Sequence, residues 1–539
     1  KEVILMPKNK KTNYSYEDYF NLPNPGLRSY FGNVERGSSD IITSPWIRGD
    51  NEQKLKQTKA ILNEWMSHLE SLKTEWPSLF EYESDMAAKV GPMSVMAPLK
   101  ARLDDIDAYY NLINKDAAPV SQQANLAALA KFKRARGLTL RSQQRVVDLM
   151  KKSTNSGSPY FIKRRNVVDK TVPVQVLHDE QILNGRSWKY CAVLGWRGQE
   201  GGPDIDDVKQ RVVWMFPFGI NVLELQLYQP LIEALQAHSD VPAWVGMDAV
   251  DLAITKLFDT KDSKDLVICT DFSKFDQHFN QSLQDSAKTI LTSILTPTKE
   301  SHDWLEQVYP IKYDIPLSYD YGKIRFGKHG MGSGSGGTNA DETLAHTALQ
   351  FESAILNKTR LNPYSQCLGD DGILSYPGIT ADKVMRSYTT HGLEMNASKQ
   401  YESTHDCTYL RRWHHTKYRV DGVCVGVYST ARALGRLCMQ ERYYDPEVWG
   451  PKMVALRQLS ILENVKWHPL RDEFAEFCMK RDKYDLGLKI PGFLDNIERE
   501  ASKAIEYMPD FLGYTRSLSF GEKTGISSWW IVNYLKSKR

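Results

Sequence analysis

The sequence feature that most constrains this chain is a pair of adjacent aspartates, Asp370 and Asp371, enclosed by glycines. Short, partly apolar runs flank the Gly-Asp-Asp-Gly tetrapeptide at residues 364–368 and 373–376. This pattern predicts a strand, a tight turn and a second strand, with both carboxylates at the tip of a hairpin. Two like charges so close raise each other's pKa, and a divalent cation such as Mg²⁺ relieves that repulsion. The alternative is an ordinary solvent-exposed turn, because Asp-Gly is common in hairpins.

Charge distribution and cysteine spacing narrow the class of protein. The 539 residues are 41% hydrophobic and 25% charged, as in a globular protein large enough for several subdomains. The net charge of +3 does not indicate nucleic-acid binding by itself, but residues 131–152 carry eight basic side chains and one acid. Such a run is either a solvated helix face or a phosphate-binding track. Seven scattered cysteines without a Cys-x-x-Cys pair disfavour a zinc site, and no long apolar run predicts a membrane span.

A second acidic element lies about a hundred residues before the aspartate pair. An apolar run over residues 266–269 predicts a buried strand, and Asp271 stands at its end. Asp276 follows at the turn into a helix expected over residues 277–295. A carboxylate at the exit of a strand is held by a rigid element, where a metal ion can be presented to a substrate.

A glycine-rich loop and a pair of cations complete the pattern. Residues 330–337 contain five glycines and lead into a helical pattern, so the backbone there can approach a phosphate or a base closely. The glycine spacing matches a dinucleotide fingerprint by letter, but no βαβ unit surrounds it, and no Walker A lysine follows. Lys209 and Arg211 alternate in a strand expected over residues 209–215. They therefore face the same side, where they either grip a triphosphate or guard a sheet edge.

In combination, these elements resemble the palm of viral RNA-dependent RNA polymerases. Asp271 and Asp276 match motif A, Ser333, Gly334 and Thr338 match motif B, and Gly369-Asp370-Asp371 matches motif C. Lys399 resembles the lysine of motif D, residues 409–413 read as the strand of motif E, Lys209 and Arg211 resemble the basic end of motif F, and residues 153–159 resemble motif G. The resemblance spans residues 153–413, and motifs A and B are most similar to those of picobirnaviruses, which have segmented double-stranded RNA genomes.

The resemblance implies an α+β right-hand polymerase fold, in which an antiparallel palm sheet with helices lies between fingers and thumb. The implied divisions are an N-terminal arm that bridges fingers and thumb (1–59), fingers (60–260), palm with motif A (261–299), a fingers insertion with the motif B loop (300–345), palm with motifs C, D and E (346–415), and thumb (416–539). A thumb segment within 480–525 is expected to support initiation without a primer.

The resemblance also implies a two-metal mechanism and assigns a role to each matched residue. Asp271, Asp370 and Asp371 would hold Mg²⁺, for which Mn²⁺ is expected to substitute. Lys399 would be the general acid for pyrophosphate, and Asp276 would accept a hydrogen bond from the ribose 2′-hydroxyl. The other nucleotide-binding residues would be Lys209, Arg211, Ser333, Gly334, Thr338 and Asn339. The RNA-binding residues would be Ser156, Gly157, Pro159, Arg411 and Arg412.

One position departs from the family pattern. Four residues after Thr338 the family often has an asparagine, which helps the second aspartate of motif A to read the ribose. This chain has Glu342 there, and Asn339 lies nearby in the sequence. Either side chain is therefore a candidate partner of Asp276.

The implied function is replication and transcription of a double-stranded RNA genome. The expected partners are single- and double-stranded RNA, ribonucleoside triphosphates and a viral capsid protein, without a membrane, and the expected locations are the virion interior and the host cytoplasm. Two alternatives stay open: a genome-binding structural protein with an inactive polymerase fold, and a Mg²⁺-dependent nuclease. The intact aspartates disfavour the first, and a nuclease would need neither Asp276 nor the glycine loop.

Overall fold

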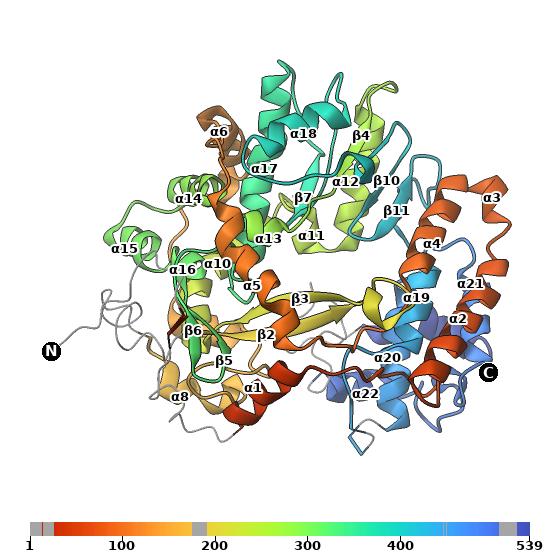
Figure 1. The fold of residues 1–539 in the computed structure, drawn as a ribbon. Helices are drawn as coiled ribbons and strands as arrows, with labels where there is room; N and C mark the ends of the chain where they lie inside the picture. The colour runs from red at the N-terminus through yellow and green to blue at the C-terminus, as the bar shows by residue number, and fades with distance from the viewer. Residues whose placement is uncertain (1–12, 15–25, 175–190, 446, 449, 506–524) are drawn as a thin grey trace.

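The computed structural model describes residues 13–14, 26–174, 191–445, 447–448, 450–505 and 525–539. Helices surround three small sheets, and the largest sheet has the strand order β1-β6-β5-β2-β3 (Figure 1). Its strands are β1 (Asn13–Tyr14), β2 (Ala192–Gln199), β3 (Lys209–Met215), β5 (Leu317–Asp320) and β6 (Lys323–Arg325). All neighbours are antiparallel except β2 and β5. The expected strand over residues 209–215 is confirmed, with Lys209 and Arg211 exposed at alternate positions.

The second sheet is fully antiparallel and has the order β7-β8-β4-β9. Its strands are β4 (Val267–Thr270), β7 (Gln366–Leu368), β8 (Asp371–Leu374) and β9 (Tyr401–Ser403). This confirms both the buried strand before Asp271 and the strand–turn–strand around the aspartate pair. The helix expected over 277–295 is interrupted, because the Asn280 side chain caps a new helix by accepting hydrogen bonds from the backbone of Ser282 and Leu283. The two pieces are α13 (Phe275–His278) and α14 (Gln281–Ile294).

The third sheet corrects an expectation. Residues 409–413 do not form one strand: β10 (Asp406–Tyr409) and β11 (Arg412–His415) are joined by a tight turn, and β12 (Val427–Tyr428) pairs with β11. The two turn residues, Leu410 and Arg411, have φ values of 52° and 58°. Positive φ at both central positions is usual for Asn or Gly and unusual for these side chains. The turn is therefore held by tertiary contacts that local sequence does not reveal.

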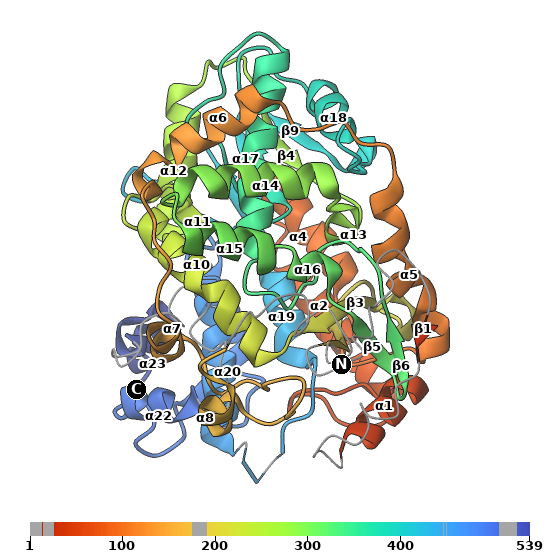
Figure 2. The same ribbon diagram turned by 90° about the vertical axis from the view of Figure 1, so that its left-hand side faces the viewer.

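The largest hydrophobic core joins helices that cover the second sheet. Its central helix, α17 (Thr338–Leu356), contacts β7, α14, α6 (Gln122–Lys131) and α18 (Ala381–Thr389), as Figure 2 shows for the stacked helices. The other helices between residues 103 and 314 are α5 (Leu103–Asn111), α7 (Gln143–Leu149), α8 (Val168–Thr171), α10 (Phe218–Gln236), α11 (Pro242–Val245), α12 (Met247–Thr260), α15 (Lys299–Gln307) and α16 (Ile311–Asp314). No helix in the described part of the chain is long and apolar enough to cross a membrane.

A separate core joins the N-terminal helices to the C-terminal helices. Trp65 is fully buried there: its Nε1 donates to Thr430 Oγ1 at 2.8 Å, and its ring lies 4.8 Å from that of Phe474. Residues 60–89 thus pack with the segment expected to be the thumb, which differs from their expected place in the fingers. The N-terminal helices are α1 (Leu27–Arg36), α2 (Asn51–Ser67), α3 (Leu72–Glu75) and α4 (Pro77–Lys89), and the C-terminal ones are α19 (Thr430–Cys438), α20 (Pro451–Glu463), α21 (Arg471–Met479), α22 (Ile497–Ala504) and α23 (Trp530–Lys536).

The segment between α1 and α2 runs from the five-stranded sheet to the C-terminal helices (Figure 1). At one end α1 packs on β5, and at the other the Ser44 amide donates to Cys438 O at 2.9 Å. Trp46 Nε1 also donates to Asp482 at 3.2 Å. The described part of the expected arm therefore makes backbone contacts with the C-terminal helices, while residues 1–12 and 15–25 lie outside the described residues.

Candidate active site

The register of the second sheet brings Asp271 to the hairpin tip. Leu368 pairs with Asp371, so that Gly369 and Asp370 form a two-residue turn, in which Gly369 has a φ of 58°. On the other side of β8, Thr270 pairs with Gly372. Asp271, the residue that follows β4, therefore emerges beside the aspartate pair, although it lies 99 positions before Asp370 in the sequence.

Side chains of helix α17 hold the β7–β8 hairpin by hydrogen bonds to its turn. The Gly369 amide donates to Thr343 Oγ1 at 2.9 Å, and His346 Nδ1 lies 2.8 Å from Gly369 O. Burial lowers the pKa of His346 to about 4, so the ring is neutral and Nδ1 carries the donated hydrogen. A Cβ atom on Gly372 would lie 2.7 Å from the His346 ring, which explains the second glycine of the motif. Neither Thr343 nor His346 had a sequence signal beyond a helical pattern.

The aspartates at the tip perturb one another. Burial and the charge of Asp370 raise the pKa of Asp371 to about 7, although the Leu410 amide donates to Asp371 Oδ2 at 2.8 Å. Burial, followed by the charge of Asp276, raises the pKa of Asp370, and Asp271 adds to this effect. Burial raises the pKa of Asp271 as well, offset by Lys399, Lys89 and Lys209. The structure therefore brings all four predicted acidic residues into one electrostatic group.

Five exposed cations face this group. Burial lowers the pKa of Lys209, and so do the charges of Lys89, Lys399, Arg211 and Arg411. Within the described residues, none of the five forms an ion pair with a carboxylate. Such an uncompensated cluster is suited to a polyanion such as a triphosphate.

Contacts of neighbouring residues with the backbone determine the positions of Lys399 and Lys89. Gln400 donates to Asp271 O at 2.8 Å and accepts from the Asp271 amide at 2.9 Å, which holds the neighbouring Lys399 next to Asp271. Lys89 ends α4, and a Cβ atom on Gly91 would lie 1.7 Å from Gly202 O, in the loop that leads into β3. Lys89 was missed from the sequence, because a single lysine at a helix end carries no functional signal.

The carboxylates fit a divalent cation that also binds substrate oxygens. Among the residues that the structure describes, no three His, Cys, Asp or Glu side chains already form a metal-binding group. The Asp371 carboxylate accepts from the Leu410 amide in the β10–β11 turn, whereas Asp271 and Asp370 are exposed. Mg²⁺ is usually held by one or two carboxylates together with water and substrate phosphates, so this donor set suits it.

A carboxyl pair lies next to the tip. The Glu342 side chain is 5% exposed and lies beside the side chain of Asp276. Burial and the charge of Asp276 raise the pKa of Glu342 well above its usual value. Asn339 has another partner, because its Oδ1 accepts from Trp244 Nε1 at 2.7 Å. Of the two candidates, Glu342 is therefore the one that contacts Asp276.

The motif B side chains shape their own loop. Thr338 Oγ1 donates to Gly332 O at 3.1 Å, and Ser333 Oγ accepts from the Trp214 amide at 3.1 Å. A Cβ atom on Gly334 would lie 1.7 Å from Trp214 O, so this position requires glycine. Ser333 and Thr338 thus have partners within the protein, and their backbone is what can approach a ligand.

Two of the residues expected to contact RNA are engaged elsewhere. Ser156 is 1% exposed, and its Oγ accepts from the Ile162 amide at 3.3 Å. Arg412 is buried and makes a bidentate ion pair with Asp251, with N···O distances of 2.7 and 2.9 Å. The structure therefore removes both side chains from the expected RNA contacts, because their polar atoms already bind protein groups. Gly157 in the same loop is buried as well and Pro159 is half-buried, whereas Arg411 is an exposed member of the cation cluster.

The basic run over residues 131–152 is only partly available to phosphates. Lys131 Nζ donates to Ser365 O at 3.1 Å, and Arg141 pairs with Glu233. Arg134, Arg136 and other members stay exposed. The run is therefore split between internal contacts and surface charge.

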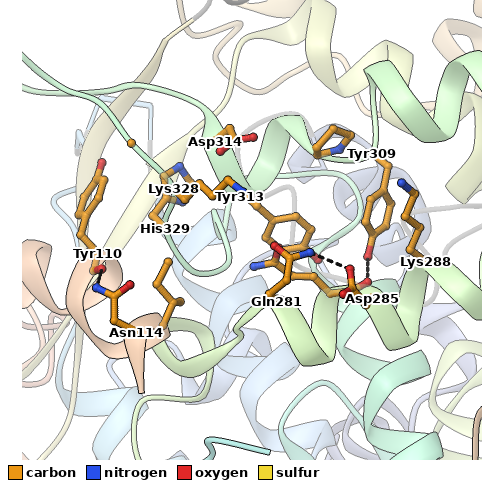
Figure 3. A pocket seen from close by; sticks show the side chains of 14 residues that line it. Tyr110, Asn114, Gln281, Asp285, Lys288, Tyr309, Tyr313, Asp314, Lys328 and His329 are labelled. Carbon is orange, nitrogen blue, oxygen red and sulfur yellow. Dashed lines mark hydrogen bonds between the residues drawn. The ribbon is translucent and has the colours of Figure 1, made fainter. Parts of the chain in front are cut away.

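A cavity of about 520 Å³ lies between α5, α14, α16 and residues 327–329 (Figure 3). Tyr313 in its wall donates to Asp341 at 2.7 Å, and Asp341 also pairs with the buried Lys312 at 3.0 Å. The cavity thus adjoins the network beneath the first turn of α17.

Comparisons with known proteins agree on one family. The family model described as viral RNA-dependent RNA polymerase matches residues 99–423. A curated protein of Human picobirnavirus (strain Human/Thailand/Hy005102/-), described as a potential RNA-dependent RNA polymerase, is 60% identical over 534 residues, which cover 97% of this chain and 99% of that protein.

Solved structures agree as well. The crystal structure of the RNA-dependent RNA polymerase of a human picobirnavirus superimposes with a TM-score of 0.91 at 58% identity, covering 98% of this chain and 100% of that one. The insertion loop deletion mutant of such a polymerase gives a TM-score of 0.89 at 57% identity, with the same coverage.

The burial of Arg412 predicts a difference between two adjacent arginines. Arg412→Ala leaves Asp251 buried without its ionic partner, so we expect the free energy of unfolding to fall by about 3–5 kcal/mol. Arg411→Ala, the matched control on the exposed side of the turn, should change it by less than about 0.5 kcal/mol. Urea unfolding followed by tryptophan fluorescence measures both. Equal losses in the two variants would contradict the structural role of Arg412.

Proposed function

The chain belongs to the viral RNA-dependent RNA polymerases and has their right-hand fold, and from this premise we propose how its residues carry out nucleotidyl transfer. The family uses divalent metal ions, and we propose that Asp271 and Asp370 hold Mg²⁺, with Mn²⁺ able to substitute. When bound, two such ions lower the pKa of the attacking 3′-hydroxyl and neutralise the leaving pyrophosphate. Asp371 orients the hairpin through its bond to the Leu410 amide. The observation that carries this proposal is the β4–β8 register, which brings Asp271 to the level of the hairpin tip, where its charge raises the pKa of Asp370.

The cation cluster is proposed to bind the triphosphate. Lys209 and Arg211 lie on one face of β3, so both can reach the same phosphate chain. Lys399, held next to Asp271, is proposed as the general acid that gives a proton to pyrophosphate. Lys89 adds a further charge on the same side. Catalysis then rests on positioning and charge neutralisation.

Asp276 is proposed to accept a hydrogen bond from the ribose 2′-hydroxyl, the group that distinguishes RNA from DNA. Glu342, whose raised pKa favours its protonated form, is proposed as the donor that fixes the Asp276 carboxylate. Asn339, held by Trp244, supports the hairpin from the side of Gly369.

RNA is proposed to follow the half-buried backbone of the glycine loop near Gly334, the loop at Gly157 and Pro159, and Arg411. The fingers, palm and thumb divisions given by the resemblance are retained as a proposal, with one change. Residues 51–89 join the thumb core, because α2 and α4 pack on α19.

We also propose initiation without a primer, replication and transcription in the virion interior and the host cytoplasm, and a capsid protein as partner. The segment proposed to support initiation lies within 480–525. Leu486, Phe493 and Ile497 are buried in the C-terminal core, and residues 506–524 lie outside the described residues.

The metal-binding role predicts that single carboxylates are indispensable. Asp271→Ala and Asp370→Ala should each lower the rate of labelled ribonucleotide incorporation on an RNA template by roughly several orders of magnitude. Asp265→Ala is the matched control: it removes an aspartate just before the other end of β4, where the carboxylate accepts from the Gly378 amide at 3.2 Å. Template binding without Mg²⁺-dependent incorporation by the wild type would instead favour the structural-protein alternative.

The Glu342–Asp276 pair predicts a defined effect on sugar selection. Glu342→Ala should reduce the preference for ribonucleotides over deoxyribonucleotides about tenfold, because Asp276 loses its donor. Glu342→Gln keeps a donor of similar shape and should retain the preference. The ratio of kcat/KM for ATP and dATP measures this. An Asn339→Ala variant that loses selectivity while Glu342→Ala keeps it would reverse the assignment.

The role of residues 506–524 in initiation can be tested without altering the C-terminal hydrophobic core. Ser527 donates to Glu498 Oε1 at 2.9 Å near the start of α22, and residue 505 follows the end of the same helix, so a Gly-Ser linker that spans the length of α22 can replace residues 506–524. We expect this variant to lose incorporation on an unprimed template and to keep extension of a primed one. Unimpaired unprimed synthesis would refute a role for residues 506–524 in initiation.

A further inference from the structure

One buried side chain contacts two loops that are far apart in the sequence. Asn221 lies in the first turn of α10 and is 4% exposed. Its Oδ1 accepts from Arg164 Nη2 at 2.9 Å, and Arg164 closes the loop that contains Gly157. Its Nδ2 lies 3.2 Å from Gly334 O in the glycine loop. The Asn221 amide group therefore joins the two loops directly.

Glu224, one turn further along α10, strengthens the contact with the glycine loop. Asn221 Nδ2 also donates to Glu224 Oε1 at 3.1 Å, and the Gly336 amide donates to the same oxygen at 3.0 Å. Ser335 Oγ donates to Oε2. Glu224 is fully buried, so its lone pairs are used by the loop rather than by water. Breaking such buried hydrogen bonds costs free energy because it leaves polar groups unsatisfied, so the glycine loop is held firmly on α10.

Arg164 holds the other loop by a second bond. Its Nη1 donates to Lys151 O at 3.0 Å, and burial lowers the pKa of its guanidinium to about 10. A guanidinium that is largely removed from water needs partners in the protein. Asn221 provides the side-chain partner, so loss of its oxygen would release this loop.

The strand that carries the triphosphate-binding cations runs between the same two loops. A Cβ atom on Gly157 would lie 2.7 Å from Phe216 O, and the Phe218 amide donates to Ser156 O at 2.8 Å. On the glycine-loop side the approach is closer, because a Cβ atom on Gly334 would lie 1.7 Å from Trp214 O. Residues 214–218, which follow Lys209 and Arg211, are therefore packed against both loops.

We propose that Asn221 is a positioning residue that couples the two RNA-facing loops to strand β3, so that a seated template improves the placement of Lys209 and Arg211 for the nucleotide. This inference rests on the proposed function. A packed interior transmits a shift at one loop to its neighbours, because its side chains have few alternative arrangements. The coupling is reciprocal, so bound nucleotide must tighten template binding by the same factor.

The reciprocity gives a binding test that does not depend on turnover. The dissociation constant of a fluorescent RNA template is measured by anisotropy, with and without an α,β-methylene nucleoside triphosphate and Mg²⁺. In the wild type we expect the nucleotide to tighten template binding about tenfold. In Asn221→Ala, and in Arg164→Ala, this factor should fall to about twofold. The double variant should be no worse than either single variant, because both act on one connection.

Two further variants separate coupling from simple damage. Asn221→Asp keeps the acceptor for Arg164 and loses the donor to Gly334 O, so it should also lose the coupling. Gln226→Ala is the matched control on α10: its Nε2 donates to Arg141 O at 2.9 Å, outside the network, and the factor should stay near tenfold. Thermal unfolding checks that each variant is folded, and if Asn221→Ala is not, Arg164→Ala decides.

A folded Asn221→Ala or Arg164→Ala variant with the wild-type factor would overturn the proposal, and so would a wild type without coupling. Failure of the proposed function looks different, because then neither nucleotide incorporation nor its loss in Asp370→Ala would be observed. The two outcomes are therefore distinguishable in the same set of proteins.

Discussion

The antiparallel pairing of β4 with β8 decides where the acidic side chains lie, and the rest of the site is arranged around it. Because Thr270 faces Gly372, Asp271 emerges at the level of the hairpin tip, and a slip of one residue would turn it to the other face of the sheet. The site is thus defined by backbone hydrogen bonds rather than by flexible side chains. The cost of gathering acids there is offset by five basic side chains that come from α4, β3, the segment before β9 and the β10–β11 turn.

Helix α17 links the parts that must act together. Its first turn continues the glycine loop, and Glu342, Thr343 and His346 all lie at or beside the hairpin. Glu342 also contacts Asp276, which follows β4. One helix thus carries the glycine loop at its end and touches both aspartate motifs along its side. A buried ion pair between Lys312 and Asp341 fixes that end, with Tyr228 and Tyr313 as further donors to Asp341.

The features that could be predicted from sequence are those with a local signature. The hairpin at Gly369, the strand before Asp271 and the shared face of Lys209 and Arg211 follow from turn chemistry and from the two-residue period of a strand. The missed features depend on distant partners. Asp251 buries Arg412 from 161 positions away, and Asp371 holds a turn at Leu410 that has no turn residues. The packing of α2 on α19 likewise depends on an apolar face whose partner lies some 370 residues later.

The raised pKa of Asp371 indicates that the basic side chains do not fully compensate the repulsion between the acidic ones. In the unfolded chain an aspartate has a pKa near 4, whereas here burial and Asp370 raise it to about 7. A carboxyl whose pKa is raised on folding stabilises the fold at low pH, and this contribution is lost as the pH rises through the folded value. Near neutral pH the repulsion between the acids therefore costs stability, and the basic side chains beside them offset only part of that cost. Bound divalent cations would relieve the remaining repulsion between the carboxylates, and a bound triphosphate would neutralise the basic side chains. Binding of the substrates would therefore stabilise this part of the protein.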